Sequence, residues 1–165
     1  MKIHSSTILS ILVLFIGCIL FGLTAEAEAE RTGGITIRVE GIKSDKGSIV
    51  LILCNSQDMY QSELDKYGEI SDTSFRSVSA EIKSNSFEWI FEDIPYGEYA
   101  LMLYHDENNN GKLDKNAMEQ PKEPYAFSNN ARAPARSPPK YEKVKFSVDQ
   151  PSVTLQIQVE QDKDK

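Results

Sequence analysis

Seven short segments between residues 35 and 159 constrain the fold more than any other feature of the sequence. In most of them apolar and polar residues alternate, as in residues 35–40 (ITIRVE), where Ile35, Ile37 and Val39 fall on one face. Alternation at period two is typical of a strand with one buried face. The seven segments are residues 35–40, 49–54, 78–82, 87–91, 99–104, 143–148 and 153–159. Short strands joined by turns, with no internal repeat, predict one all-β domain, an antiparallel two-sheet β-sandwich.

Two segments refine this prediction. Residues 49–54 (IVLILC) are continuously apolar, which indicates a central strand covered on both faces and a buried, unreactive thiol at Cys54. Residues 55–74 are polar and predict a loop with a short helix. The Gly97-Glu98-Tyr99 start of the next strand is similar to corners in immunoglobulin-like and transthyretin-like sandwiches, in which the tyrosine hydroxyl fixes the turn.

The first 27 residues predict a signal peptide. A short polar start precedes a nearly continuous apolar stretch at residues 8–23, and small residues at 25 and 27 suit a signal peptidase. An uncleaved anchor and a lipoprotein cleaved at Cys18 are the alternatives. We therefore expect a signal peptide at 1–27, a linker at 28–33, the sandwich at 34–160 and a charged tail at 161–165, in a secreted or periplasmic protein.

The net charge of the 165-residue chain is −7, with an isoelectric point near 4.9. Nucleic acids and anionic membrane surfaces both require a basic protein face. The composition therefore excludes a nucleic-acid partner, and no membrane association is expected after the signal peptide is cleaved. Cations are the more natural counterpart.

One long loop, after the fifth predicted strand, carries most of the polar chemistry. Residues 106–114 (DENNNGKLD) place oxygen-bearing side chains at relative positions one, three, five and nine, and a glycine at position six. This is the spacing of a calcium-binding loop, in which position seven contributes its backbone carbonyl. The predicted Ca²⁺ ligands are Asp106, Asn108, Asn110, Lys112 through its carbonyl, and Asp114.

The calcium pattern is incomplete. Position twelve, where an EF-hand has a bidentate glutamate, is Ala117, and a strand rather than a helix precedes the loop. We expect a further ligand from Asn116, Glu119 or Glu123, or from Glu107, and a weak dissociation constant of about 10⁻⁴ to 10⁻³ M. The alternative is that Asp, Asn and Gly simply form turns, with side chains bonded to their own backbone.

The same residues carry a family resemblance. The stretch HDENNNGKLD at 105–114, then PKEPYAFSNNAR at 121–132 and the pair Pro138 and Pro139, resembles the bacterial DUF2141 family. The resemblance implies a secreted or periplasmic single β-sandwich domain, and the family has no established biochemical function. The chain departs from the family pattern at Glu119, at Ala126 where glycine is usual, and at Ser137 before the double proline.

The second motif, residues 125–132, mixes aromatic rings with amides and a hydroxyl, which suits recognition of a sugar or peptide. The interpretation that we favour is structural. Phe127 would fill the core, while Ser128, Asn129 and Asn130 would hydrogen-bond to the calcium loop and hold it closed. His105 and Tyr125 are assigned to the same supporting set.

The sequence thus predicts a binding or structural module with a calcium-type loop, acting on an unidentified ligand of the cell envelope or extracellular space. The alternative is a metal-free interaction domain that binds glycan or protein through residues 104–132. A hydrolase is the third hypothesis, because His105, Asp106 and Ser128 are the only residues close in the motifs that resemble a catalytic set. The sequence has no nucleophile elbow, zinc-ligand cluster or phosphate-binding glycine loop, so we expect no enzyme activity.

Overall fold

The computed structural model describes residues 30–66, 74–118, 120–132 and 137–159. The predicted signal peptide at 1–27 and the charged tail at 161–165 lie outside the described residues, as does Glu119. None of the helices in the described residues is long and apolar enough to span a lipid bilayer.

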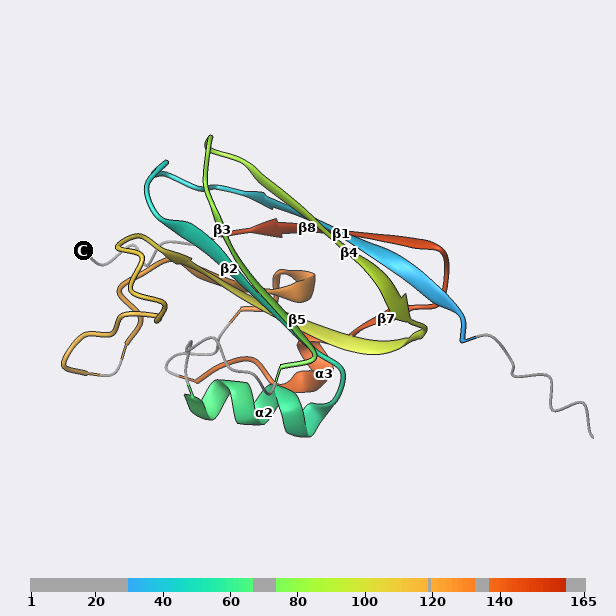
Figure 1. Ribbon diagram of the computed structural model, residues 1–165. Coiled ribbons are helices and arrows are strands. Elements are labelled where there is room, and N and C mark those ends of the chain that lie inside the picture. The colour runs from blue at the N-terminus through green and yellow to red at the C-terminus, as the bar shows by residue number, and fades with distance from the viewer. Residues whose placement is uncertain (1–29, 67–73, 119, 133–136, 160–165) are drawn as a thin grey trace, which may run out of the picture.

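Two β-sheets pack face to face and form a sandwich (Figure 1). The first sheet has the order β4 (Phe87–Pro95), β1 (Thr32–Glu40) and β8 (Ser152–Gln158). The second sheet has the order β3 (Arg76–Glu81), β2 (Ser48–Cys54), β5 (Gly97–Asp106) and β6 (Tyr125–Phe127), and β7 (Phe146–Val148) also pairs with β5. The all-β sandwich prediction is confirmed, as is the long loop after the fifth strand.

Three details of the structure go beyond or differ from the strand prediction. The segment predicted as a strand at 143–148 begins in the helix α3 (Tyr141–Val144), and only Phe146–Val148 form a strand. The described chain has eight strands, because the second motif contains the three-residue strand β6, which is too short to show an alternation. The sandwich is also not wholly antiparallel, since β1 and β8 run parallel from the pair Gly34 and Ser152 to the pair Glu40 and Gln158. Alternation reveals which face of a strand is buried but not the direction of its neighbour.

The central strands β2 and β5 of the five-stranded sheet are buried on both faces. The inner face of this sheet meets the first sheet in one apolar core. Its outer face is covered by the helix α2 (Gln57–Lys66) and the short helix α3 (Tyr141–Val144), which enclose a second core (Figure 1). The 3₁₀ turn η1 (Ser128–Asn130) follows β6 and lies against β8 of the first sheet. Every residue of β2 is therefore buried, as the continuous apolar run predicts.

Two local predictions are also confirmed. The hydroxyl of Tyr99 donates a hydrogen bond of 2.7 Å to the carbonyl of Pro95, and this bond fixes the corner between β4 and β5. Cys54 is a free, fully buried thiol. Burial, together with the negative charge of Glu63, raises the pKa of the Cys54 thiol to about 12, so it stays protonated.

Candidate metal-binding loop

The strand β5 delivers two buried polar residues to the start of the long loop. His105 is 1 % exposed and Asp106 is 2 % exposed, and both still pair with β2. Gly47, just before β2, has a φ of +83°, and a Cβ there would lie 2.1 Å from the carbonyl oxygen of Asp106. Glycine is required at position 47, because a side chain there would collide with the backbone at the start of the long loop.

The Asp106 carboxylate organises the first turn of the loop. Its two oxygens accept hydrogen bonds from the backbone N–H groups of Asn110 at 3.1 Å and of Gly111 at 2.7 Å. Gly111 has a φ of +77°, which lets the chain turn back over the carboxylate. The side-chain oxygens of Asn108 and Asn110 accept N–H groups two residues further on, from Asn110 and Lys112. The loop is therefore wound around its own side chains.

Asp114 joins the same group of side chains. Its carboxylate accepts a hydrogen bond from the amide nitrogen of Asn108 at 2.8 Å and another from that of Asn110 at 3.0 Å. The structure thus brings together the side chains predicted at positions one, three, five and nine. The hydroxyl of Tyr104 also donates to the carbonyl of Gly111, a contact that the sequence did not indicate.

Glu123 closes the loop. One carboxylate oxygen accepts the N–H of Glu107 at 3.0 Å, and the other accepts the N–H of Asp114 at 2.9 Å. Glu123 therefore ties the beginning of the calcium-type segment to its end, and it is only 6 % exposed. Burial raises the pKa of this carboxyl group, and the charges of Asp114 and Asp106 raise it further, while the two N–H groups act in the opposite direction.

Among the predicted additional ligands within the described residues, Glu123 is thus the one whose side chain bonds to the backbone of the calcium-type segment, at Glu107 and Asp114. Asn116 is engaged elsewhere: its side-chain oxygen accepts the N–H groups of Met118 and Gln120 and closes a separate turn.

The three residues of η1 do not contact the calcium-type loop through their hydrogen bonds, so that prediction is wrong. Ser128 is fully buried; its hydroxyl accepts the N–H of Leu101 and donates to the carbonyl of Val144. The amide of Asn130 bonds the backbone of β8 at Gln156 and Gln158.

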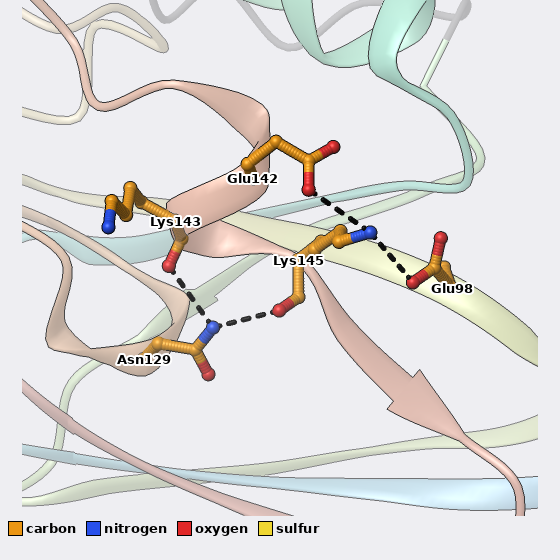
Figure 2. Close-up of polar contacts among 5 residues, drawn as sticks. All are labelled: Glu98, Asn129, Glu142, Lys143 and Lys145. Carbon is orange, nitrogen blue, oxygen red and sulfur yellow. Dashed lines mark hydrogen bonds and ion pairs between the residues drawn. The ribbon is translucent and has the colours of Figure 1, made fainter.

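The amide nitrogen of Asn129 donates to the carbonyls of Lys143 and Lys145 (Figure 2). The ammonium group of Lys145 lies between Glu98 at 3.1 Å and Glu142 at 3.2 Å. Asn129 has a φ of 61° and Asn130 a φ of 49°, a conformation that asparagine tolerates better than most residues. The motif therefore fastens β5 to α3 and to β8.

The remaining members of the supporting set have separate roles. Phe127 is buried in the second core, as predicted, and Tyr125 packs edge-on against it with ring centroids 5.9 Å apart. The Nε2 atom of His105 lies 2.7 Å from the carbonyl oxygen of Lys46. Ser128 bonds to Leu101, which lies four residues, or about 13 Å of strand, from His105. The His105, Asp106 and Ser128 set is therefore not assembled.

Within the described residues, no three His, Cys, Asp or Glu side chains form a group that could hold a metal ion. The carboxylate of Asp114 accepts hydrogen bonds from the amide nitrogens of Asn108 and Asn110. Both carboxylate oxygens of Glu123 accept hydrogen bonds from backbone N–H groups. Cation binding at this loop would require the amides of Asn108 and Asn110 to turn an oxygen inward, as the oxygen-rich ligation of calcium demands.

Residues 37–156 match the model of a family described as "Uncharacterized protein conserved in bacteria (DUF2141)". The chain belongs to this family. The match begins within β1 and ends within β8, and it covers everything between them, including the loop and the SNN segment of η1. Neither the curated proteins nor the solved structures gave a significant match to this DUF2141 chain.

Proposed function

We propose that this DUF2141 protein is a binding or structural module of the cell envelope or extracellular space, and that its loop binds Ca²⁺. One observation carries the proposal: Asp106, Asn108 and Asn110 already accept backbone N–H groups in a loop wound toward Asp114. Such winding brings alternate side chains of the pattern around one centre, where calcium would be bound once the amides of Asn108 and Asn110 turn their oxygens inward.

The donor set suits calcium better than most other cations. Asp106, Asp114 and Glu123 supply negative charge, Asn108 and Asn110 supply neutral oxygens, and the carbonyl of Lys112 stands at position seven. Flexible sets of many oxygens favour Ca²⁺ over the smaller Mg²⁺, which requires a rigid octahedron. Bound calcium would offset the mutual repulsion of the carboxylates and bridge the two ends of the loop.

The proposed location rests on the first 27 residues, whose polar start, apolar stretch and small residues are typical of a signal peptide. Calcium is present at about millimolar concentration outside cells, so a site with a dissociation constant of about 10⁻³ M would be partly filled there.

Thermal melting with and without calcium tests the metal proposal. A ligand that binds only the folded state stabilises it by mass action. With a dissociation constant of about 1 mM, 10 mM calcium adds about 1.4 kcal/mol of stability. For a domain of this size, that gain corresponds to a rise in melting temperature of about 4 °C.

The variant Asp114→Asn keeps the size of the side chain and removes its charge, and we expect it to lose the calcium-dependent rise. The matched control is Asp45→Asn, which removes the same charge from an exposed turn and should keep the full rise. An unchanged melting temperature of the wild-type protein in 10 mM calcium would defeat the proposal.

A metal-free interaction loop is the second candidate, and one observation favours it. Asp114 and Glu123 already accept two N–H groups each, so the loop satisfies its carboxylates without a cation. In that case the wild-type protein would melt at the same temperature with and without calcium. Asp114→Asn would then lower stability equally in both conditions.

A further inference from the structure

Asn110 and Gly111 form the single Asn-Gly pair of the sequence, and both belong to the calcium-type loop. In such a pair the backbone nitrogen of the glycine can attack the side-chain carbonyl carbon of the asparagine, because glycine has no side chain to obstruct the approach and its backbone rotates freely. Asn110 is exposed, and a Cβ added to Gly111 would meet no atom within 4 Å outside its chain neighbours. The pair is therefore open to deamidation, the conversion of the Asn110 carboxamide into a carboxylate.

The reaction needs only water as a co-reactant. A bond forms between the nitrogen of Gly111 and Cγ of Asn110, and the bond from Cγ to Nδ2 breaks. Nδ2 leaves as ammonia with the proton that the Gly111 nitrogen loses, and a cyclic succinimide remains. Water that attacks Cγ opens the ring, restores the original backbone and leaves an aspartate. Water that attacks the backbone carbonyl carbon leaves an isoaspartate instead, in which the main chain runs through the side-chain carbon.

The contacts of the loop supply the groups that this reaction uses. The N–H of Gly111 donates to Oδ2 of Asp106 at 2.7 Å, so a proton acceptor lies directly at the attacking nitrogen. The Oδ1 atom of Asn110 accepts the N–H of Lys112 at 2.8 Å. This contact polarises the carbonyl group under attack and stabilises the negative charge that develops on its oxygen. Both contacts therefore favour the attack.

Deamidation would reverse the contact between Asn110 and Asp114. The Nδ2 atom of Asn110 donates to Oδ1 of Asp114 at 3.0 Å. An oxygen in place of Nδ2 cannot donate, and two carboxylates so close together repel each other. A cation between them removes the repulsion, and calcium loops accept either asparagine or aspartate at position five. The amide thus satisfies Asp114 without a metal ion, whereas a carboxylate would make the loop depend on one.

We propose that Asn110 is a modification site, and that its deamidation to aspartate converts the loop into a tighter calcium site. The proposal rests on the calcium binding proposed above and adds a means by which the chain sets the affinity of that site. Each modified chain gains one negative charge among the ligands, and the affinity of calcium loops depends on the charge of their ligands. Because ammonia is lost, the modified form accumulates with the age of the protein.

Peptide mapping by mass spectrometry tests the modification. The purified protein is incubated at neutral pH without calcium, and a urea-unfolded sample serves as the positive control. We expect the folded protein to gain the mass difference between a carboxamide and a carboxylate at Asn110, and not at the neighbouring Asn108 or Asn109. If Asn110 stayed unchanged in the folded protein while the unfolded chain was modified there, the proposal would be overturned.

Calcium titration of two variants tests the effect on affinity. Asn110→Asp reproduces the aspartate product and should bind calcium about tenfold more tightly than the wild-type protein. The matched control is Asn109→Asp, which adds the same charge one residue earlier. The Oδ1 atom of Asn109 accepts the hydroxyl of Ser48 at 2.8 Å, and a carboxylate can keep this bond. The control should therefore change the affinity much less, and equal affinities of the two variants would refute the effect.

The outcomes separate this proposal from the calcium function. If Asn110→Asp binds calcium and the wild-type protein does not, the calcium function fails for the unmodified chain and the role of Asn110 stands. If the wild-type protein binds calcium and Asn110→Asp binds it no more tightly, the calcium function stands and the role of Asn110 fails. If neither binds, both fail.

Melting in calcium-free buffer provides a second measurement that needs no ligand. Asn110→Asp should melt at a lower temperature than both the wild-type protein and Asn109→Asp, because its new carboxylate faces Asp114. The same melts show that each variant is folded. Equal melting temperatures of Asn110→Asp and the wild-type protein would contradict the repulsion on which the proposal depends.

Discussion

Replacement of Ser128 by alanine should destabilise the protein strongly, because the hydroxyl serves two buried backbone groups. The hydroxyl accepts the N–H of Leu101 and donates to the carbonyl of Val144. The bond to Leu101 continues the pairing of β5 with β6 by one residue, with a side chain in place of the backbone. Both residues are fully buried. Each buried backbone group left without a partner costs about 1–3 kcal/mol, so the expected loss of unfolding free energy is about 2–6 kcal/mol.

That loss is a large part of the about 5–15 kcal/mol that holds a typical domain folded. Urea unfolding measures it, with the fluorescence of Trp89, the single tryptophan, as the probe. The control is Ser147→Ala on β7, an exposed serine that should change stability by less than about 0.5 kcal/mol. If Ser128→Ala were as mild as Ser147→Ala, the assignment of η1 as the fastener of β5 to α3 would be wrong.

Three further predictions follow from single groups. The pKa of Glu123 is raised above its ordinary value near 4.5, so the folded protein holds this proton more tightly than the unfolded chain does. The calcium-free protein should therefore lose stability as the pH rises from about 4.5 through the raised pKa. Thermal melting of the Glu123→Gln variant should not show this loss. Tyr99→Phe removes the hydroxyl bond to Pro95 and should cost about 0.5–1.5 kcal/mol in urea unfolding; an unchanged midpoint would refute the role of this corner. The Cys54 thiol, with a pKa of about 12, should not react with a thiol reagent at pH 8 until the protein unfolds, and rapid labelling of the folded protein would show that it is accessible.

The features of the fold that depend on local patterns were predictable from the sequence. Alternation located most of the strands, and the unbroken apolar run of β2 revealed a strand with two covered faces. The parallel pairing of β1 with β8 was not predictable, because the residues on the buried face are the same whichever way the neighbouring strand runs.

In the candidate site, too, local contacts were predictable from the sequence and distant contacts were not. The spacing of Asp106, Asn108, Asn110 and Asp114 was enough to place these side chains in one group, because a short loop determines its own geometry. The partners of Ser128, Asn129 and Asn130 lie 14 to 28 residues away in sequence, on elements whose positions only the folded chain determines. The prediction that these three residues bond to the calcium-type loop relied on their closeness to it in sequence, and it was therefore wrong.

The parallel pairing of β1 and β8 also bears on how the chain can acquire its structure. β1 lies between β4 and β8, and Ile37 on β1 faces Leu155, more than 100 residues later. The three-stranded sheet thus stays incomplete until the last strand has been synthesised, and contacts so distant in sequence slow folding. Because the strands are parallel, segments attached before β1 and after β8 leave from opposite ends of the sheet, about 23 Å apart along the seven residues of β8. Labels placed at Thr32 and at Gln158 would therefore lie at opposite ends of the three-stranded sheet.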